Sequence, residues 1–376
     1  MFTETLMASI QQGNMQDTVG WIFQLIWVLA FVFIWIYGQR IQTVLMLKEI
    51  EGSLYKLKVM RDRGRQITIS TIKEVGKPDE DPEPRVDRLL EHVDIEPVTL
   101  DPTGVIRRLE HIINVREFKL RDEVRQMAPR ADEMQINNLA NVLETALALN
   151  QIYKIVRHYY LMGKKTLSFY VILQIQMILP LIMRESEAFI SALRAFTLGQ
   201  PIGDGAGALV AARLMQGKEK RIIAQDTVVS EVDIEGRKAY VIKARGPGGN
   251  VGKPGEAIRQ IIEEKEGKIA LIIIIDAAQK LEGERPGEVA EGVGVAIGGP
   301  GVDKYKVEDI ATKYRIPLYA VLIKEGIEDV ISTIRKEIVD GVEEATERIK
   351  RIIREKTKSG DAVIIAGIGN TIGISQ

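Results

Sequence analysis

The chain has 376 residues, of which 27% are charged, with a net charge of −1, three histidines and no cysteine. This length predicts more than one folded unit, and the balanced charge gives no general attraction to nucleic acid, so no nucleic-acid partner is expected. The absence of cysteine excludes disulfides, thiolate zinc sites and iron–sulfur clusters. Because His92, His111 and His158 are far apart in the sequence, no metal site is predicted.

Residues 19–37, VGWIFQLIWVLAFVFIWIY, predict a transmembrane helix. One glutamine is the only strongly polar side chain of this stretch, and a helix of this length covers about 28 Å, close to the hydrocarbon thickness of a bilayer. Trp21, Trp35 and Tyr37 lie near the two ends, where amphipathic rings favour the membrane interface. We therefore expect residues 1–40 to form a short tail and a membrane anchor.

The charges around this segment favour an uncleaved anchor over a signal peptide. A signal peptide begins with basic residues and ends at a small-residue cleavage site, but residues 1–39 carry no Lys or Arg and residues 38–40 make a poor site. Basic side chains follow the segment at Arg40, Lys48, Lys56, Lys58, Arg61, Arg63 and Arg65. Since positive charge stays inside, we expect a single-pass protein of the cell membrane, with its amino terminus outside and its other domains cytoplasmic.

The next two segments are predicted to be mainly helical. Residues 41–103 continue the anchor as a helix and end in a proline-rich, acidic linker. Residues 104–219 predict a helical domain, in which the apolar residues of 131–162 recur at spacings of three and four. Asp132 is expected to start that helix and Gly163 to end it.

Residues 167–183, LSFYVILQIQMILPLIM, permit more than one interpretation. The stretch is apolar enough for a second span, or for a re-entrant or membrane-surface helix. It is only 17 residues long, however, and contains two glutamines and Pro180 near its end. A buried helix of a helical bundle is therefore the favoured interpretation.

A glycine-rich break, GQPIGDGAG at residues 199–207, follows the helices. It precedes a short helical run, ALVAARLM, and places Asp204 between two glycines. An acid in this position usually caps the next helix, and capping is the favoured interpretation over a catalytic role for Asp204.

Residues 220–376 predict an α/β domain. Two strand-like runs on either side of Glu235 and Gly236 predict a leading antiparallel hairpin. After it come helices at 254–266, 304–314 and 327–357, strands at 268–276, 293–299 and 317–323, and a final strand in DAVIIAGIG. Such an alternation is typical of a Rossmann-like, mostly parallel sheet that is covered on both faces.

Glycine-rich turns follow several of these strands and mark the candidate site. Ligands of open parallel sheets bind beyond the carboxyl ends of the strands, and the turns and one strand-end acid are expected to meet there. The candidate binding residues are Arg245, Gly248, Gly249, Lys253, Asp276, Gly299 and Gly369. They do not identify a cofactor.

The loop RGPGGNVGKPG, residues 245–255, matches neither familiar nucleotide-binding pattern. A P-loop needs GxxxxGK followed by Ser or Thr, but Pro247 occupies the first glycine position and Pro254 follows Lys253. The dinucleotide pattern GxGxxG fails as well, because its third glycine is missing. The backbone N–H groups of 248–253, beside two basic side chains, are still suited to one small anion, although a purely structural glycine turn is favoured.

Four acidic residues in a loop between two strands are a second candidate. Glu282, Glu284, Glu288 and Glu291 have the oxygen ligands that Mg²⁺ or Ca²⁺ prefers, but solvated surface acids are the favoured interpretation. No serine–histidine–acid arrangement is available, because residues 220–376 contain no histidine.

The stretches GPGGNVGKPGEAI, DAAQKLEGERPGEVAEG and VAIGGPGVDKYKVED, together with the anchor and the helical middle, resemble an archaeal membrane protein family of similar length. That family is described only as a domain of unknown function. The resemblance covers essentially the whole chain, implies an archaeal source and transfers no catalytic residue. A composition rich in Lys, Glu, Arg and Ile, without Cys, also favours a thermophilic source.

Three functions from different classes follow as hypotheses. The favoured one is a membrane-anchored cytoplasmic assembly or scaffold protein, a homo-oligomer, with an α/β domain that binds a small anionic ligand. The second is an enzyme that acts on a nucleotide or phosphorylated metabolite at the glycine-rich edge of the sheet. The third is a membrane transport component, which requires residues 167–183 to enter the bilayer.

Overall fold

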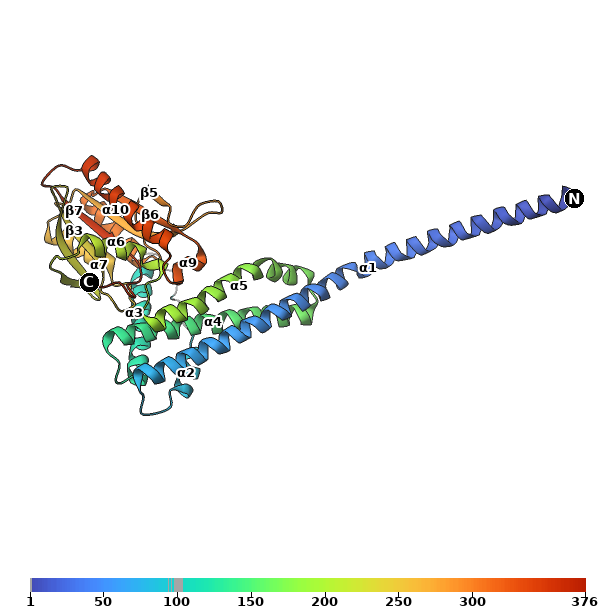
Figure 1. Cartoon of the computed structure of the whole chain (residues 1–376), viewed down its shortest axis with the longest axis horizontal. Coiled ribbons are helices and arrows are strands. Elements are labelled where there is room, and N and C mark those ends of the chain that lie inside the picture. Colours follow the sequence, from blue (N-terminus) through green and yellow to red (C-terminus); the bar gives the residue numbers. More distant parts are fainter. Residues whose placement is uncertain (1, 94, 96, 98–103) are drawn as a thin grey trace. The chain divides into compact units, whose positions relative to one another are not determined.

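The structure, a computed structural model, describes residues 2–93, 95, 97 and 104–376, with side chains from residue 20 onward except residues 34–36 and the gaps (Figure 1). It divides into two compact units, residues 1–57 with 153–182 and residues 58–152 with 183–376. The helices are α1 (Phe2–Thr71), η1 (Ile72–Gly76), α2 (Glu83–Leu90), α3 (Val105–Met127), α4 (Glu133–Thr166), α5 (Phe169–Leu198), η2 (Gly203–Gly205), α6 (Ala206–Leu214), α7 (Pro254–Glu264), α8 (Val302–Tyr314), α9 (Ile327–Ile331) and α10 (Lys336–Lys356). The strands are β1 (Arg221–Ala224), β2 (Thr227–Ile234), β3 (Arg237–Ala244), β4 (Leu271–Gln279), β5 (Val289–Val293), β6 (Leu318–Glu325) and β7 (Ala362–Gly367).

The first unit is built from parts of α1, α4 and α5. Its buried side chains recur at helical spacing along each segment. They are Thr43, Met46, Leu47, Ile50 and Leu57 on α1, Val156 and Tyr160 on α4, and Ile172, Ile175 and Leu179 on α5. A Cβ on Gly163 would lie 2.8 Å from Ile172 Cγ1, so this glycine allows α4 and α5 to pack closely. Gly163 therefore serves close packing and does not end the helix, since α4 runs on to Thr166, beyond its predicted end.

Residues 167–183 lie mostly in α5, which the unit buries on one side only. Ile172, Ile175 and Leu179 are buried, as a bundle helix requires. Tyr170 and Met177 are exposed on the other side. This stretch of α5 therefore has one buried side and one exposed side, although its sequence is apolar almost throughout.

The amino-terminal part of α1 exposes apolar side chains all around the helix. The large exposed side chains of this part are Trp21, Ile22, Phe23, Leu25, Ile26, Trp27, Val28, Leu29, Phe31, Val32 and Phe33. Within the described residues, no single helix is apolar enough over a sufficient length to cross a membrane, but Gly20–Phe33 and Tyr37–Gly76 meet that test as a pair bent by 50°. Trp35, which the sequence places at the membrane interface, lies outside the described side chains.

In the second unit, the segment predicted to be a linker contains the packed helix α2. Val86 and Leu89 of α2 share a hydrophobic core with Val124 of α3. Arg65 of α1 binds Asp87 of α2 at 2.5 Å. Burial of one apolar face thus holds this acidic segment in a helix, while residues 94, 96 and 98–103 lie outside the described part.

Asp132 starts α4 as predicted. Its Oδ1 accepts a hydrogen bond from the backbone N–H of Gln135 at 2.8 Å, and Gln135 Oε1 accepts one from the backbone N–H of Asp132 at 2.9 Å. This reciprocal pair satisfies two amides that a helix start leaves without partners.

The described residues form a seven-stranded sheet in the order β1-β2-β3-β7-β4-β6-β5. The contacts β3–β7, β7–β4 and β4–β6 are parallel, whereas β1–β2, β2–β3 and β5–β6 are antiparallel. The α/β prediction is confirmed in its coarse form, but the sheet is mixed rather than mostly parallel. The predicted hairpin is present, with Glu235 and Gly236 at φ 55° and 74° in the two-residue turn that joins β2 to β3.

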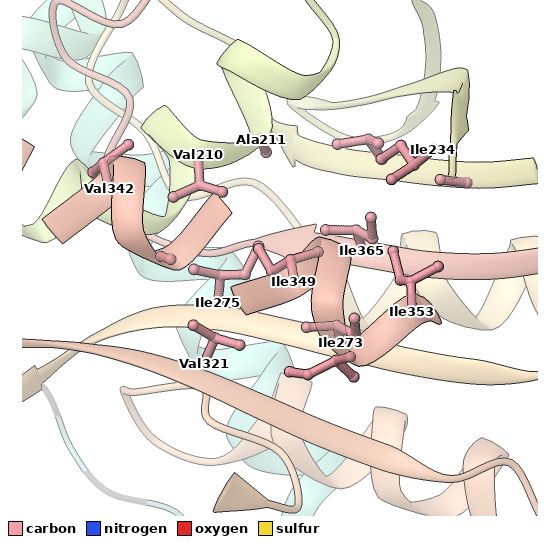
Figure 2. Close-up of a cluster of buried hydrophobic side chains, with 14 of the residues drawn as sticks. Val210, Ala211, Ile234, Ile273, Ile275, Val321, Val342, Ile349, Ile353 and Ile365 are labelled. Atoms are coloured by element: carbon pink, nitrogen blue, oxygen red, sulfur yellow. The ribbon is translucent and has the colours of Figure 1, made fainter. Parts of the chain in front are cut away.

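Both faces of the sheet are covered. On one face, the side chains of α6 and α10 meet those of the strands, and Figure 2 shows Val210 of α6 and Ile349 of α10 among Ile273, Ile275 and Ile365. On the other face, α7 and α8 bury Ile258, Ile261, Val307 and Ile310 against β3, β4 and β7. Continuous isoleucine runs therefore occur where both faces of a strand are buried.

Residues 293–299 do not form the predicted strand. The strand here is β5, which ends at Val293 and runs antiparallel to β6. Gly294 follows with φ 114°, a conformation that favours glycine, and the chain turns away from the sheet. Residues 294–301 become a loop.

The predicted helix 327–357 is interrupted between α9 and α10. Thr333 forms a bridge with Ile202, and the N–H of Ile334 donates to the carbonyl of Pro201 at 2.8 Å. These backbone bonds hold residues 332–335 extended and attach them to the segment just before Asp204.

Candidate functional site

A cavity of about 230 Å³ lies at the carboxyl-terminal edge of the parallel strands. Segments distant in the sequence contribute its lining. They are Glu110, Ile113, Asn114 and Glu117 on α3, Asp204, residues 251–254, Asp276, residues 297–303, Lys306 and residues 368–369. This is the edge at which parallel sheets bind their ligands.

Asp276 ends the buried run of β4 and opens onto the cavity. Its Oδ1 accepts a hydrogen bond from the N–H of Ala277 at 2.8 Å, and its Oδ2 accepts one from the N–H of Gly298 at 3.3 Å. Burial, followed by the charge of Asp204, raises the pKa of Asp276 to about 8. At neutral pH the carboxyl is therefore mostly protonated and able to donate a hydrogen bond.

Asp204 lines the same cavity instead of capping α6. No side chain among the described residues caps the start of α6, and Asp204 Oδ2 accepts a hydrogen bond from the N–H of Asn370 at 2.7 Å. Burial raises the pKa of Asp204 above its usual range. The capping prediction is wrong, because the chain after β7 supplies the amide that this carboxylate binds.

Glu325, at the end of β6, is a third buried carboxyl of this region and lies outside the cavity lining. It is 0% exposed, and neither carboxyl oxygen has a hydrogen-bond partner among the described residues. Burial, followed by the charges of Asp204, Asp329 and Asp276, raises its pKa to about 8. Glu325 is therefore mostly neutral at neutral pH and adds little charge to the site.

Two lysines of the cavity form ion pairs with α3. Lys253 Nζ lies 2.9 Å from Glu117 Oε2, and Lys306 Nζ lies 2.5 Å from Glu110 Oε1. Glu110 and Glu117 are two helical turns apart on α3, so one face of this helix meets both lysines. A third α3 side chain, Arg121, binds Asp226 at 2.7 Å and attaches the same helix to the turn between β1 and β2.

The amino terminus of α8 also lines the cavity. Gly299 and Gly301, with φ 79° and 88°, shape the approach to it, and no side chain of the described residues caps this helix start. A helix start without a side-chain cap presents backbone N–H groups to a ligand. The start of α7 differs, because Asp303 Oδ1 accepts a hydrogen bond from the N–H of Gly255 at 2.9 Å.

The first half of the loop 245–255 is a structural junction. The N–H of Gly249 donates to Asn138 Oδ1 at 2.9 Å, and its carbonyl accepts from Asn141 Nδ2 at 2.8 Å. Thr371 Oγ1 donates to the carbonyl of Gly248 at 2.9 Å. Residues 248–250 are thus held between α4 and the segment after β7, and only residues 251–254 reach the cavity.

The structure brings together four of the seven predicted binding residues. Lys253, Asp276, Gly299 and Gly369 line the cavity. The other three, Arg245, Gly248 and Gly249, do not line it; Gly249 borders a neighbouring pocket instead. No sequence pattern indicates Glu110, Glu117 and Lys306, because what marks them is ion pairing between segments that only the fold brings together.

Three of the four candidate acids between β4 and β6 form surface contacts. Glu284 lies 3.4 Å from Lys324, Glu288 accepts a hydrogen bond from the N–H of Arg285, and Glu291 binds Arg348 and Arg351. In the part of the chain that the structure describes, no group of three His, Cys, Asp or Glu residues is placed to hold a metal ion.

Two family descriptions match almost the whole chain. Residues 24–199 match the N-terminal domain of the protein of unknown function DUF1512, and residues 202–375 match the DUF1512 C-terminal domain. The chain belongs to the DUF1512 family. The resemblance noted in the sequence is thereby confirmed as membership of an uncharacterised family, and the comparison with curated proteins gives no match.

The two DUF1512 domains meet at the cavity. Their boundary falls between residues 199 and 202, directly before Asp204. The N-terminal domain contributes the wall on α3, and the C-terminal domain contributes the remaining lining. Both family domains therefore line the cavity, and an interface between domains is a common position for a ligand site.

Proposed function

We propose that this DUF1512 protein is anchored in the cell membrane by residues 19–37 and binds a small phosphorylated metabolite or nucleotide in the cavity at the edge of its sheet. The observation that carries the binding proposal is the convergence of Asp204, Asp276, Lys253 and Lys306 on one cavity. A concave site with a few converging polar groups and perturbed pKa values is the usual form of a ligand site.

The rim of the cavity supports the phosphate part of the proposal. The start of α8 directs backbone N–H groups to this side, and Lys253 and Lys306 add positive charge. At present each lysine pairs with a carboxylate of α3. A phosphate group carries more negative charge than a glutamate and also accepts hydrogen bonds from the backbone N–H groups of α8, so it is expected to take over these lysines.

The inner carboxyls, Asp204 and Asp276, favour a ligand that carries hydroxyl groups. Because burial raises the pKa of Asp276 to about 8, this carboxyl repels a nearby phosphate less than an ionised carboxylate would. A protonated carboxyl donates one hydrogen bond and accepts others, which matches a sugar hydroxyl. The same pair is also suited to general acid–base chemistry on such a hydroxyl.

The exposed helix of residues 20–33 supports the membrane anchor. A helix that is apolar all around is stable in lipid or in a protein interior, and its large side chains are exposed here. With no basic residue before Arg40, the positive-inside rule favours an external amino terminus and a cytoplasmic cavity.

Thermal unfolding of the full chain in detergent tests the binding proposal. Sugar phosphates, nucleotides and inorganic phosphate are expected to raise the Tm, and the unphosphorylated sugars and nucleosides are the matched controls. Lys306→Ala should abolish the rise, whereas Lys304→Ala, on the exposed side of the same helix, should preserve it. If no phosphorylated compound shifts the Tm of the native chain, the proposed ligand class is wrong.

A second candidate function is an assembly protein that forms homo-oligomers. Large exposed apolar side chains of α4 and α5 favour it, namely Ile155, Tyr159, Met177, Ile178 and Leu181. Exposed apolar clusters often mark self-association. Light scattering of the full chain in detergent should give one discrete oligomer that Met177→Lys dissociates, and a monodisperse native monomer would contradict this candidate.

A further inference from the structure

The turn between α4 and α5 exposes apolar and aromatic side chains. α4 ends at Thr166 and α5 begins at Phe169. Between and beside them, Leu167 is 54% exposed and Tyr170 is 77% exposed. Leu167 also has a φ of 51°, a conformation that a glycine adopts with less strain. The turn therefore exposes a leucine at a conformational cost.

The sequence around this turn contains no acid. Residues 145–184 contain no Asp or Glu, although these make up 52 of the 376 residues of the chain. The same stretch carries five basic side chains, which are Lys154, Arg157, Lys164, Lys165 and Arg184. Residues 18–48 of α1 also contain no acid and carry Arg40 and Lys48. Lys164, Lys165 and Arg40 lie at the end of the first unit that carries the turn, whereas Lys154 and Arg157 lie further from the turn along α4 and Arg184 lies outside this unit. The charge at the turn is therefore complementary to an anionic surface.

The turn lies level with the part of α1 that follows the apolar segment. A Cβ on Gly163 would contact both Ile172 and Leu47, and Gln176 Nε2 donates to Glu49 Oε2 at 2.6 Å. α1 and α5 therefore run in the same direction here, which places residues 166–168 near residues 41–43 of α1. From residue 37 to residue 41 a helix rises about 6 Å, so the turn lies close to the end of the proposed span.

We propose that this turn, with Lys164, Lys165, Leu167 and Tyr170, rests on the anionic lipid surface of the membrane that residues 19–37 enter. The inference relies on the proposed anchor for its position. Tyr170 is the kind of amphipathic ring that favours the interface, Leu167 adds apolar contact, and the two lysines attract acidic headgroups. The contact would fix the helical unit against the bilayer at a second point.

Single-cysteine labelling of the full chain tests this proposal, because the native chain has no cysteine. Leu167→Cys and Tyr170→Cys are labelled with an environment-sensitive dye in vesicles of phosphatidylcholine and phosphatidylglycerol that contain headgroup-level nitroxide lipids. The expected result is a blue-shifted emission and loss of most of the fluorescence. Val293→Cys, at a side chain that is 87% exposed in the α/β domain, is the control that should stay solvent-like.

The label at residue 167 tests whether the turn contacts the membrane surface. A label at Val28→Cys tests the proposed anchor, because acyl-chain nitroxides quench it only if residue 28 lies in the bilayer. A solvent-like signal at residue 167 overturns the surface contact, even where residue 28 is deeply quenched. A blue shift at residue 167 without nitroxide quenching means that protein covers the turn, which overturns it as well. Equal quenching in phosphatidylcholine alone, or after Lys164→Gln with Lys165→Gln, overturns the role of acidic headgroups.

Discussion

Asp276 shows how a strand-end carboxyl becomes sensitive to pH. Its pKa is raised to about 8, chiefly by burial, whereas the pKa of an aspartate in the unfolded chain is about 3.9. Between these values the folded chain holds a proton that the unfolded chain has released. The free energy of unfolding therefore falls as pH rises from about 4 to about 8, and this group changes it no further above that range.

Asp276→Asn should remove this dependence, because an amide stays neutral at all these pH values. The free energy of unfolding of the variant, relative to the native chain, is expected to increase by up to a few kcal/mol between about pH 5 and pH 8. Chemical denaturation at both pH values measures it. Asp309→Asn, at an exposed position of α8, should give a constant difference, and a constant difference for Asp276→Asn would show that Asp276 is ionised in the folded chain.

At the scale of single residues, the sequence predicted the position of residues at strand ends. It did not predict the position of residues that are held by partners distant in the sequence. Asp276 and Lys253 were predicted because the carboxyl ends of parallel strands meet at one edge. The position of Asp204 in the cavity cannot be predicted from local spacing, because its hydrogen-bond partner is the distant amide of Asn370. Gly249 fits a ligand loop in sequence but is held by two asparagines of α4.

At the scale of elements, α6 packs against the sheet through glycines. A Cβ on Gly207 would overlap the carbonyl oxygens of Ile275 and Ile368, and a Cβ on Gly367 would overlap the carbonyl oxygen of Gly207. Gly207→Ala should therefore lower the free energy of unfolding by about 2 kcal/mol or more, because backbone atoms must move apart. Gly292→Ala has open space around its Cβ and is the matched control. Equal midpoints of denaturation for the two variants would contradict the close contact.

The acidic face of α3 should compete with the proposed phosphate. Glu110 and Glu117 pair with the cavity lysines, so Glu110→Gln with Glu117→Gln removes two competing charges, while Glu256 stays 3.5 Å from Lys306. The affinity for inorganic phosphate, measured by calorimetry, is expected to rise about tenfold, which corresponds to about 1.4 kcal/mol. Asp122→Asn removes a charge from α3 outside the cavity lining and should change the affinity little. A lower affinity in the double variant would mean that the glutamates position the lysines rather than compete for them.

The elements that the sequence predicted correctly are those with strong local patterns. Apolar runs and amphipathic helices identified β4, β6, β7, α7 and α8. The interruption between α9 and α10 was missed, because residues 332–334 are held by backbone bonds to residues 201–203, which no local pattern encodes. For β5, the glycines after Val293 end the strand earlier than its apolar residues indicate.

At the scale of the whole molecule, the helical half supplies part of the cavity lining. Sequence patterns treat a helical domain and an α/β domain as separate units, and the N-terminal and C-terminal family descriptions divide the chain similarly. The wall on α3, however, reaches the sheet edge through Glu110, Glu117 and Arg121. Long-range ion pairs of this kind cannot be predicted from sequence spacing. The sequence therefore predicted the strand ends that line the cavity but not the wall that α3 contributes.

Deletion of residues 1–40 tests how the whole molecule is held at a membrane. The packed side chains of α1 begin at Thr43, so the shortened chain should keep the denaturation midpoint of the full chain. The full chain should remain in the membrane fraction at high salt, because apolar burial in lipid is insensitive to ionic strength. The shortened chain should bind anionic vesicles only at low salt, since screening weakens the attraction of its lysines. Sedimentation with vesicles measures both, and release of the full chain by salt alone would contradict the anchor.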